Sequence, residues 1–312
     1  MSRVFITGIT GFLGSNIGRY LIEDGHTVAA IYRGTSSKKL CAGFEDQIDW
    51  ILQDESNWTE KAEKFSPEII IHSAWLGVSH LERNIWDKQL ENIEFVKQLL
   101  LIAKSADTKK VIALGSQAEY GMFEGCVAES HQLKPTEAYG SVKIVCSELL
   151  KQFCNSNNID WYWLRLFSVF GSGESENWLI PTLINKLLTS NYMDLTPGEQ
   201  KYAYLYADDL GRAINNIIVN KGKSGVYNIS AKQPVSLKNL VTTIRDQVNP
   251  KFELHFGKLE YRENQAMHIQ GDVTKFIEAF GEFELSDFKQ ALALTIDSIK
   301  GQFKIKQANE SI

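Results

Sequence analysis

The chain has 312 residues, of which 44% are hydrophobic and 23% are charged, which is the composition of an ordinary globular protein. Its formal net charge of -5 at pH 7 argues against nucleic-acid binding, so we expect a small-molecule partner. No apolar run reaches about 18 residues and no signal-peptide pattern opens the chain, so we expect a cytoplasmic protein without membrane contact. The cysteines show no metal-type spacing, and we expect reduced thiols and no metal site.

Short apolar runs alternate with longer amphipathic runs in the first half of the chain. Such a series predicts a parallel sheet covered by helices on both faces, with ligands bound at the carboxyl ends of its strands. The predicted strands are residues 4–6, 27–32, 68–72, 110–114 and 160–167, and the predicted helices are residues 14–24, 84–105 and 134–154.

The pattern changes from Gly171 onward, where glycine, proline and aromatic residues break the alternation. Further helices are predicted at residues 181–190, 207–219 and 236–248. We therefore expect an α/β protein: a Rossmann-like, doubly wound parallel sheet with a smaller C-terminal α+β domain that binds substrate. The expected boundaries are 1–170, with a return segment at about 205–230, for the nucleotide-binding domain, and 171–204 with 231–312 for the other.

A glycine-rich loop lies between the first predicted strand and the first predicted helix. Gly8 and Gly11 permit a tight turn and a close approach of the backbone to a pyrophosphate, and Gly14 lets the helix pack closely on the strand. This position predicts a dinucleotide site, with Thr10, Phe12 and Leu13 as further contacts. The alternative is a glycine-rich turn without a ligand.

The loop after the second predicted strand bears on the choice of dinucleotide. A carboxylate at this place would accept the ribose hydroxyls of NAD, whereas a basic side chain would bind the 2′-phosphate of NADP. Arg33 follows the strand, with Ser36, Lys38 and Lys39 nearby, and the loop has no carboxylate. We favour NADP(H), with NAD(H) possible and a solvated basic loop as the alternative interpretation.

Tyr139 and Lys143 are four residues apart in a predicted helix. The spacing places both side chains on one face, where the ammonium would favour the phenolate and lower the phenol pKa. A phenol tuned in this way can give a proton to a ketone oxygen or take one from an alcohol. Many exposed helices show the same spacing, so the functional interpretation of the pair depends on the other motifs.

The order of these motifs resembles that of the extended short-chain dehydrogenase/reductase family, which includes nucleotide-sugar epimerases, dehydratases and ketoreductases. The likeness covers most of the chain and is closest in character to nucleotide-sugar 4-ketoreductases of the CDP-abequose/paratose synthase type. It implies a homodimer that packs through the helices around residues 87–105 and 139–153. The matching segments beyond the glycine loop are Gln53-Asp54, His72 to Trp75, Asn92, Gly115 to Gly121, Tyr139 with Lys143, Arg165 to Gly171, Tyr206 to Leu210, Tyr227 to Ile229, Arg262, Asp272 and Lys275.

The resemblance also implies roles for individual residues. Ser116 would hydrogen-bond the reacting oxygen, Tyr139 would be the acid/base, and Lys143 would hold the nicotinamide ribose. The alternatives are a strand-end cap for Ser116, a surface position for Lys143, and simple packing for the aromatic residues. Further implied contacts are Asp54, His72, Ala74, Asn92, Phe167 and Ser168 for the cofactor, and Trp75, Gln117, Asn177, Trp178, Lys201, Tyr202 and Arg262 for the substrate.

Differences between this sequence and the family's subtypes reduce the number of candidate reactions. Ser116 is followed by Gln117 and Ala118, whereas the family's dehydratases typically carry aspartate and glutamate there, so 4,6-dehydration is disfavoured. The extra cysteine and histidine of the 3,5-epimerase-reductases are also missing from the expected segments. The leading hypothesis is therefore NADPH-dependent reduction of the C4 keto group of a CDP- or dTDP-linked 4-keto-6-deoxy sugar. The alternatives are a C4 epimerase and a non-catalytic NADP(H)-binding sensor or scaffold.

Overall fold

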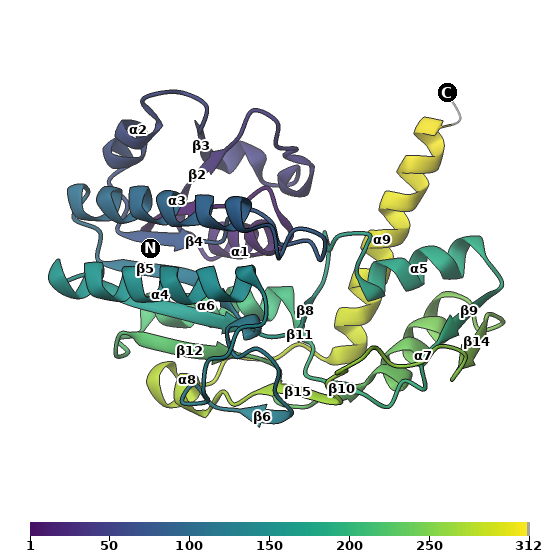
Figure 1. Ribbon diagram of the computed structural model, residues 1–312. Coiled ribbons are helices and arrows are strands. Elements are labelled where there is room, and N and C mark those ends of the chain that lie inside the picture. The colour runs from purple at the N-terminus through teal and green to yellow at the C-terminus, as the bar shows by residue number, and fades with distance from the viewer. Residues whose placement is uncertain (311–312) are drawn as a thin grey trace.

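The structure, a computed structural model, describes residues 1–310 and the side chains of residues 1–305. Within these residues the largest feature is a seven-stranded sheet with the order β12-β7-β5-β4-β1-β2-β3 (Figure 1). All of its neighbouring strands are parallel. The strands are β1 Arg3–Thr7, β2 Thr27–Tyr32, β3 Ile48–Leu52, β4 Ile69–His72, β5 Lys110–Ser116, β7 Asp160–Leu166 and β12 Gly225–Ile229.

Helices cover both faces of this sheet, which confirms the predicted fold class. Helices α1 and α6 pack together on one face, and α3 packs with α2 and α4 on the other. Each face has its own apolar core: Val4 and Ile6 of β1 belong to one, and Phe5 to the other, because successive side chains of a strand point to opposite faces. The helices are α1 Phe12–Glu23, α2 Trp58–Phe65, α3 Trp86–Ser105, α4 Ala138–Ser156 and α6 Ala207–Val219.

The direction in which strands are added reverses at β1. From β1 the chain builds β2 and β3 on one side and then crosses to β4 on the other, so the loops after β1 and β4 diverge. In doubly wound sheets the ligand lies in the crevice at such a switch point, outside the carboxyl ends of the strands. The topology therefore brings Gly8, Ala74 and Ser116, from the ends of β1, β4 and β5, to one edge.

Smaller sheets and the helices α5, α7, α8 and α9 form the other part of the molecule (Figure 1). Helices α5, α7 and α9 surround a separate apolar core that includes Leu183, Leu240 and Leu292. The two parts share segments, because β6 comes from the first half of the chain and α8 packs on β12. The elements are β6 Gly125–Val127, β8 Val169–Phe170, α5 Leu179–Thr189, β9 Tyr192–Leu195, β10 Lys201–Tyr202, β11 Leu205–Tyr206, β13 Val235–Ser236, α7 Leu237–Val248, β14 Glu253–Phe256, β15 His268–Gly271, α8 Thr274–Phe280 and α9 Phe288–Glu310.

No helix among the described residues has the length and apolar character needed to cross a bilayer.

A buried carboxylate lies at the end of β5. Glu119 has no exposed surface, and its Oε1 accepts hydrogen bonds from the backbone N–H of Ser116 at 2.9 Å and from Trp163 Nε1 at 2.8 Å. Its Oε2 accepts from Arg165 Nε at 2.7 Å, and Arg165 is itself only 5% exposed. The pair neutralises two buried charges and fixes the Ser116 backbone to β7.

Breaking this pair should destabilise the fold. In Glu119→Ala the Arg165 guanidinium stays buried without a counter-charge, so we expect the free energy of unfolding to fall by about 3–5 kcal/mol in urea denaturation. Glu119→Gln keeps an acceptor for Ser116 and Trp163 and should lose less. Equal stability of the alanine variant and the unmodified chain would show that the pair contributes nothing.

Candidate active site

The glycine loop has no room for a side chain at two of its glycines, as expected of a loop whose backbone approaches a pyrophosphate. Gly8 has φ of 76°, and a Cβ added there would lie 2.6 Å from the backbone nitrogen of Ala74. A Cβ at Gly14 would lie 2.0 Å from the carbonyl oxygen of Gly8, so neither position admits a side chain. Helix α1 begins after Gly11 without a side-chain cap, which leaves N–H groups of its first turn available to an anion. Thr10, Phe12 and Leu13 lie in this loop or in the first turn.

His72 and Asn92 hold the neighbouring backbone. His72 Nδ1 lies 2.9 Å from Thr7 Oγ1, which also accepts from the Ala74 N–H. Burial lowers the pKa of His72 to about 3, so the ring is neutral. Asn92 Oδ1 accepts from the N–H of Leu76 at 2.8 Å, and its Nδ2 donates to the Leu76 carbonyl. Both predicted cofactor residues thus fix the chain that leaves β4, beneath the glycine loop.

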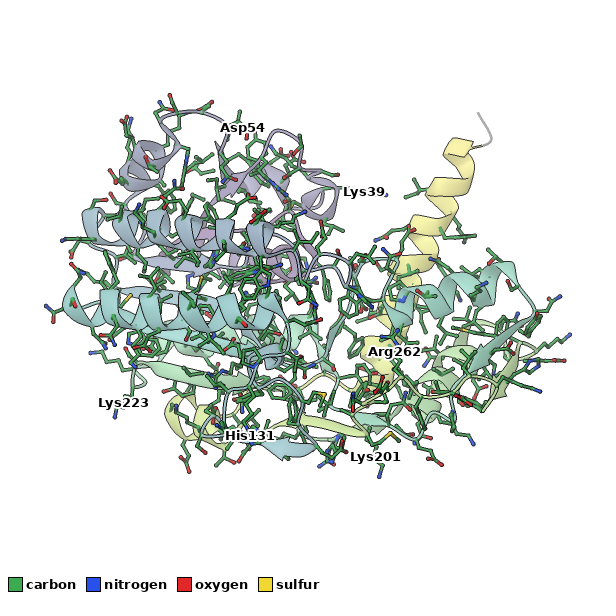
Figure 2. All side chains as sticks on the ribbon, viewed as in Figure 1. Lys39, Asp54, His131, Lys201, Lys223 and Arg262 are labelled. Atoms are coloured by element: carbon green, nitrogen blue, oxygen red, sulfur yellow. The ribbon has the colours of Figure 1, made fainter. Side chains whose placement is uncertain are left out.

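The loop after β2 combines both signs of charge. Arg33 is exposed, whereas Lys38 Nζ lies 4.3 Å and 4.1 Å from the ring centres of Tyr32 and Trp50. Asp54 joins the loop by accepting from the Gly34 N–H at 2.8 Å. Asp54 and the exposed Lys39 lie at the periphery of the nucleotide-binding part (Figure 2). Arg33 and Lys39 are therefore the basic side chains left to meet a phosphate, next to one carboxylate.

The structure brings the three predicted catalytic residues together. Ser116 ends β5, and Tyr139 and Lys143 occupy the first turns of α4. Ser116 lies close enough to Tyr139 to lower the pKa of the phenol, and the Ser116 hydroxyl also accepts from the Ala118 N–H at 3.1 Å. It is therefore both a cap and a neighbour of the phenol. Lys143 is buried, not a surface residue, and Phe167 and Ser168 follow β7 as expected.

The Lys143 ammonium is not directed at the phenol. Its Nζ donates to the Leu114 carbonyl at 2.6 Å and lies 3.5 Å from the centre of the Trp75 ring. The centre of the Tyr139 ring is 5.7 Å from the same nitrogen. Trp75, predicted to contact substrate, packs edge-on against Tyr139 and donates from Nε1 to Gln89 Oε1.

Burial dominates the titration of this group. It raises the pKa of Tyr139, while Arg83 and Ser116 lower it. Burial also lowers the pKa of Lys143 to about 7. The phenol pKa is thus not depressed as the sequence suggested, because desolvation outweighs the charges and Lys143 faces a carbonyl. At neutral pH Tyr139 is protonated and can serve as an acid.

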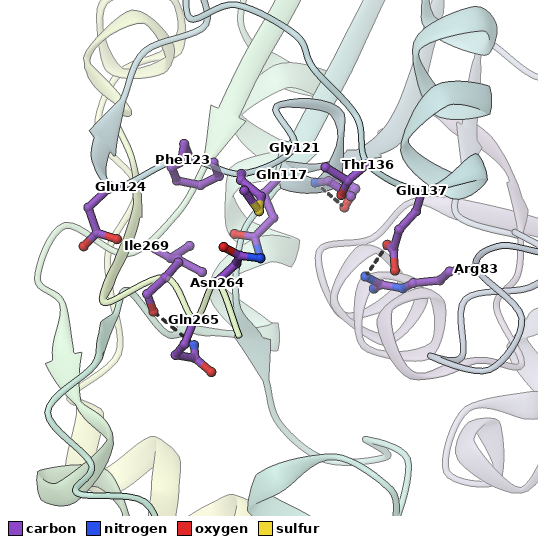
Figure 3. Close-up of a pocket in the computed structure, with 14 residues that line it drawn as sticks. Arg83, Gln117, Gly121, Phe123, Glu124, Thr136, Glu137, Asn264, Gln265 and Ile269 are labelled. Atoms are coloured by element: carbon purple, nitrogen blue, oxygen red, sulfur yellow. Dashed lines mark hydrogen bonds and ion pairs between the residues drawn. The ribbon is translucent and has the colours of Figure 1, made fainter. Parts of the chain in front are cut away.

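A cavity of about 600 Å³ opens beside Ser116 (Figure 3). Of the predicted substrate residues only Gln117 lines it, and Gln117 Oε1 is buried without a hydrogen-bond partner. In the view of Figure 3, Gln117 and Asn264 lie close together, apart from the Arg83 and Glu137 pair. The lining residues are Arg83, Ser116, Gln117, Ala118, Gly121, Met122, Phe123, Glu124, Thr136, Glu137, Asn264, Gln265, Ala266 and Ile269.

The other predicted substrate residues lie outside this lining. Asn177 and Trp178 are exposed just before α5, and Lys201 is exposed in β10. Tyr202 holds two residues of the cavity lining, because its hydroxyl donates to the Ala266 carbonyl and accepts from Gln265 Nε2. Arg262 lies two residues before the lining segment, and Figure 2 shows it with Lys201 in the C-terminal part.

Fold and site together define a dinucleotide-dependent enzyme. Residues 4–230 match the model of the NAD dependent epimerase/dehydratase family, so the chain belongs to that family. This confirms the predicted extended short-chain dehydrogenase/reductase assignment and an NAD(P) cofactor.

Relatives of the chain carry out several reactions. The chain is 23% identical to dTDP-6-deoxy-L-talose 4-dehydrogenase (NAD(+)) of Aggregatibacter actinomycetemcomitans over 86% of its own length and 99% of that protein. It is 24% identical to CDP-abequose synthase of Salmonella typhimurium, with 93% and 95% covered. The solved structure of UDP-N-acetylglucosamine 4-epimerase from Methanobrevibacter ruminantium is similar with a TM-score of 0.84 and 24% identity, over 96% and 99% of the two chains.

The burial of Lys143 predicts a pH-dependent stability. Its folded-state pKa of about 7 lies below the ordinary value of 10.5, so unfolding takes up a proton between these values and stability rises with pH across that window. Lys143→Met removes the cost of the buried charge. We expect a higher melting temperature than the unmodified chain at about pH 6 and a smaller gain at about pH 9. Lys97→Met, at an exposed lysine, is the control, and a gain equal at both pH values would contradict the interpretation.

Proposed function

We propose that the chain reduces the C4 keto group of a nucleotide-linked 4-keto-6-deoxy sugar with NADPH. The observation that carries this proposal is the proximity of Tyr139 to Ser116, the hydroxyl residue that lines the cavity. A carbonyl oxygen placed there would lie between a hydroxyl that polarises it and a phenol that can give it a proton.

The proposed reduction accounts for the hydride, the electron pair and the proton that it moves. A bound NADPH would supply a hydride, which forms the new C–H bond at C4. The electron pair of the C=O π bond moves to oxygen and takes the phenolic proton of Tyr139, forming the O–H bond. Ser116 holds that oxygen, Lys143 holds the nicotinamide ribose, and the Tyr139 phenolate regains a proton from solvent. The residues Gly8, Thr10, Gly11, Phe12, Leu13, Gly14, Arg33, Asp54, His72, Ala74, Asn92, Phe167 and Ser168 bind the dinucleotide or support its site.

Both the polar groups of the cavity and the names of the relatives support a nucleotide sugar as the substrate. The amides of Gln117, Asn264 and Gln265 offer donors and acceptors to sugar hydroxyls, and the unpartnered Gln117 Oε1 needs a donor. The names of the relatives above refer to dTDP-, CDP- and UDP-linked compounds. Arg262 would bind the diphosphate, with Asn177, Trp178, Lys201 and Tyr202 around the nucleotide.

The proposal includes an assembly and a compartment. The outer faces of α3 and α4 expose Leu90, Leu101 and Val145, which suits a homodimer in the cytoplasm with these helices at the interface. We also retain the proposed division into a nucleotide-binding part, 1–170 with 205–230, and a substrate-binding part, 171–204 with 231–312.

A C4 epimerase is the second candidate. Asp54, hydrogen-bonded to the Arg33–Gly34 loop, could accept ribose hydroxyls and so favour NAD, and one structural relative is an epimerase. An epimerase retains its cofactor, whereas a reductase exchanges it in each turnover. The third candidate is a sensor or scaffold that binds NADP(H) without catalysis.

Cofactor consumption distinguishes these candidates. With a panel of CDP-, dTDP-, GDP- and UDP-linked 4-keto sugars, we expect NADPH absorbance to fall in proportion to the sugar reduced. Tyr139→Phe should lower kcat by about 100- to 10,000-fold, because the proton donor is lost, while the Kd for NADPH stays nearly the same. Interconversion of sugars without NADPH loss would establish the epimerase, and binding without any turnover would support the sensor.

Arg33 should determine the cofactor. Loss of its charge-assisted hydrogen bonds in Arg33→Ser should raise the KM for NADPH by about 10- to 100-fold and leave the KM for NADH nearly unchanged. Lys223→Ser, at a distant basic side chain labelled in Figure 2, is the control. An unchanged KM for NADPH would leave Asp54 and NAD as the better assignment.

A further inference from the structure

Arg83 lies against the proton donor. The carbon of its guanidinium is 4.8 Å from the centre of the Tyr139 ring, and the side chain also lines the cavity. Nothing in the sequence motifs marks this residue, which lies in the long loop between β4 and α3.

The backbone fixes this placement. The N–H of Tyr139 donates to the Arg83 carbonyl at 2.9 Å, and the N–H of Ala138 donates to Asn84 Oδ1 at 3.1 Å. The first N–H groups of a helix have no acceptor within the helix, so these two bonds satisfy the start of α4. The loop that carries Arg83 is thereby tied to the same turn that carries the phenol.

Glu137 opposes Arg83 at the same place. It precedes α4, lines the cavity, and its Oε2 lies 3.5 Å from Arg83 Nη1. The guanidinium therefore contacts both the phenol ring, whose ionised form it favours, and a carboxylate, whose charge disfavours that form.

The other charged groups around Tyr139 are already engaged. Lys143 donates to the Leu114 carbonyl, and Glu119 is paired with Arg165. Burial, Glu119 and Glu137 raise the pKa of Tyr139, whereas Arg83 and Ser116 lower it. Lys143, with a pKa of about 7, is only partly protonated at neutral pH, whereas arginine stays charged throughout the working range.

The burial of Tyr139 means that its phenolate needs a nearby cation that stays charged. Tyr139 is 5% exposed, so the phenolate left after proton transfer is cut off from most solvent stabilisation. We propose that Arg83 is a positioning residue that stabilises the Tyr139 phenolate, and that Glu137 limits this stabilisation. The inference rests on the proposed role of Tyr139 as proton donor.

The two halves of the ion pair give opposite predictions. The ionisation of Tyr139 can be followed by tyrosinate absorbance, as the difference between each variant and the same variant carrying Tyr139→Phe. Arg83→Gln should move that ionisation upward by about 1 pH unit or more, since an opposite charge at this distance is removed. Glu137→Gln should move it downward, and Arg83→Lys should restore part of the first shift. Glu82→Gln, at a carboxylate of the same loop that pairs with Lys88, is the control and should not move it.

The pH profile of turnover gives a second readout. The reduction needs protonated Tyr139, so its rate falls at alkaline pH as the phenol ionises, and that fall should move upward in Arg83→Gln and downward in Glu137→Gln. Opposite shifts in the absorbance titration support the inference even if no sugar is reduced, in which case only the proposed function fails. Unmoved titrations in both variants overturn it, as does a change in KM alone, which would make Arg83 merely a substrate ligand. If Arg83→Gln does not fold, a downward shift in Glu137→Gln supports the inference and its absence overturns it.

Discussion

The site depends on how one fully buried carboxylate is neutralised. Glu119 binds the backbone of Ser116, the indole of Trp163 and the guanidinium of Arg165, so the predicted catalytic serine is held by the interior of the protein. An ionised group in this position is tolerated only because its partners are complete. The same carboxylate raises the pKa of Lys143 against the effect of burial, and so also supports the second charged group of the site. Folding and chemistry therefore share one network.

Burial shifts the pKa values of acidic and basic groups in opposite directions and so determines their protonation states. It raises the pKa of Tyr139 and lowers those of His72 and Lys143. A low-polarity environment disfavours every charged form, so acids keep their protons and bases lose them. A phenol that stays protonated near neutral pH is the state that a carbonyl reduction consumes. An alcohol oxidation would begin from the phenolate, which this environment disfavours.

Features that depend on neighbouring residues could be predicted from the sequence, whereas features that depend on contacts between distant segments could not. The glycine loop and the Tyr139–Lys143 pair were recognisable because each depends on a few neighbouring residues, and the alternation of elements indicated the parallel sheet. Strand β3 and the eight-residue α2 were missed, since neither carries a long periodic pattern. The cavity wall was largely missed too, because Arg83 and Asn264 come from loops far apart in the chain. Only the folded sheet edge brings these loops to Ser116.

Trp75 makes a long-range contact that the sequence did not indicate. An aromatic residue after β4 suggested stacking on a sugar or base, and its ring also lies 3.5 Å from the Lys143 ammonium. A buried lysine that makes no direct ion pair loses its hydration, and a cation–π contact away from solvent offsets about 2 kcal/mol of that cost. The Leu114 carbonyl supplies a hydrogen bond to the same nitrogen. Trp75 therefore stabilises the buried Lys143 ammonium, while amide side chains and the Arg83–Glu137 pair line the cavity beside Ser116.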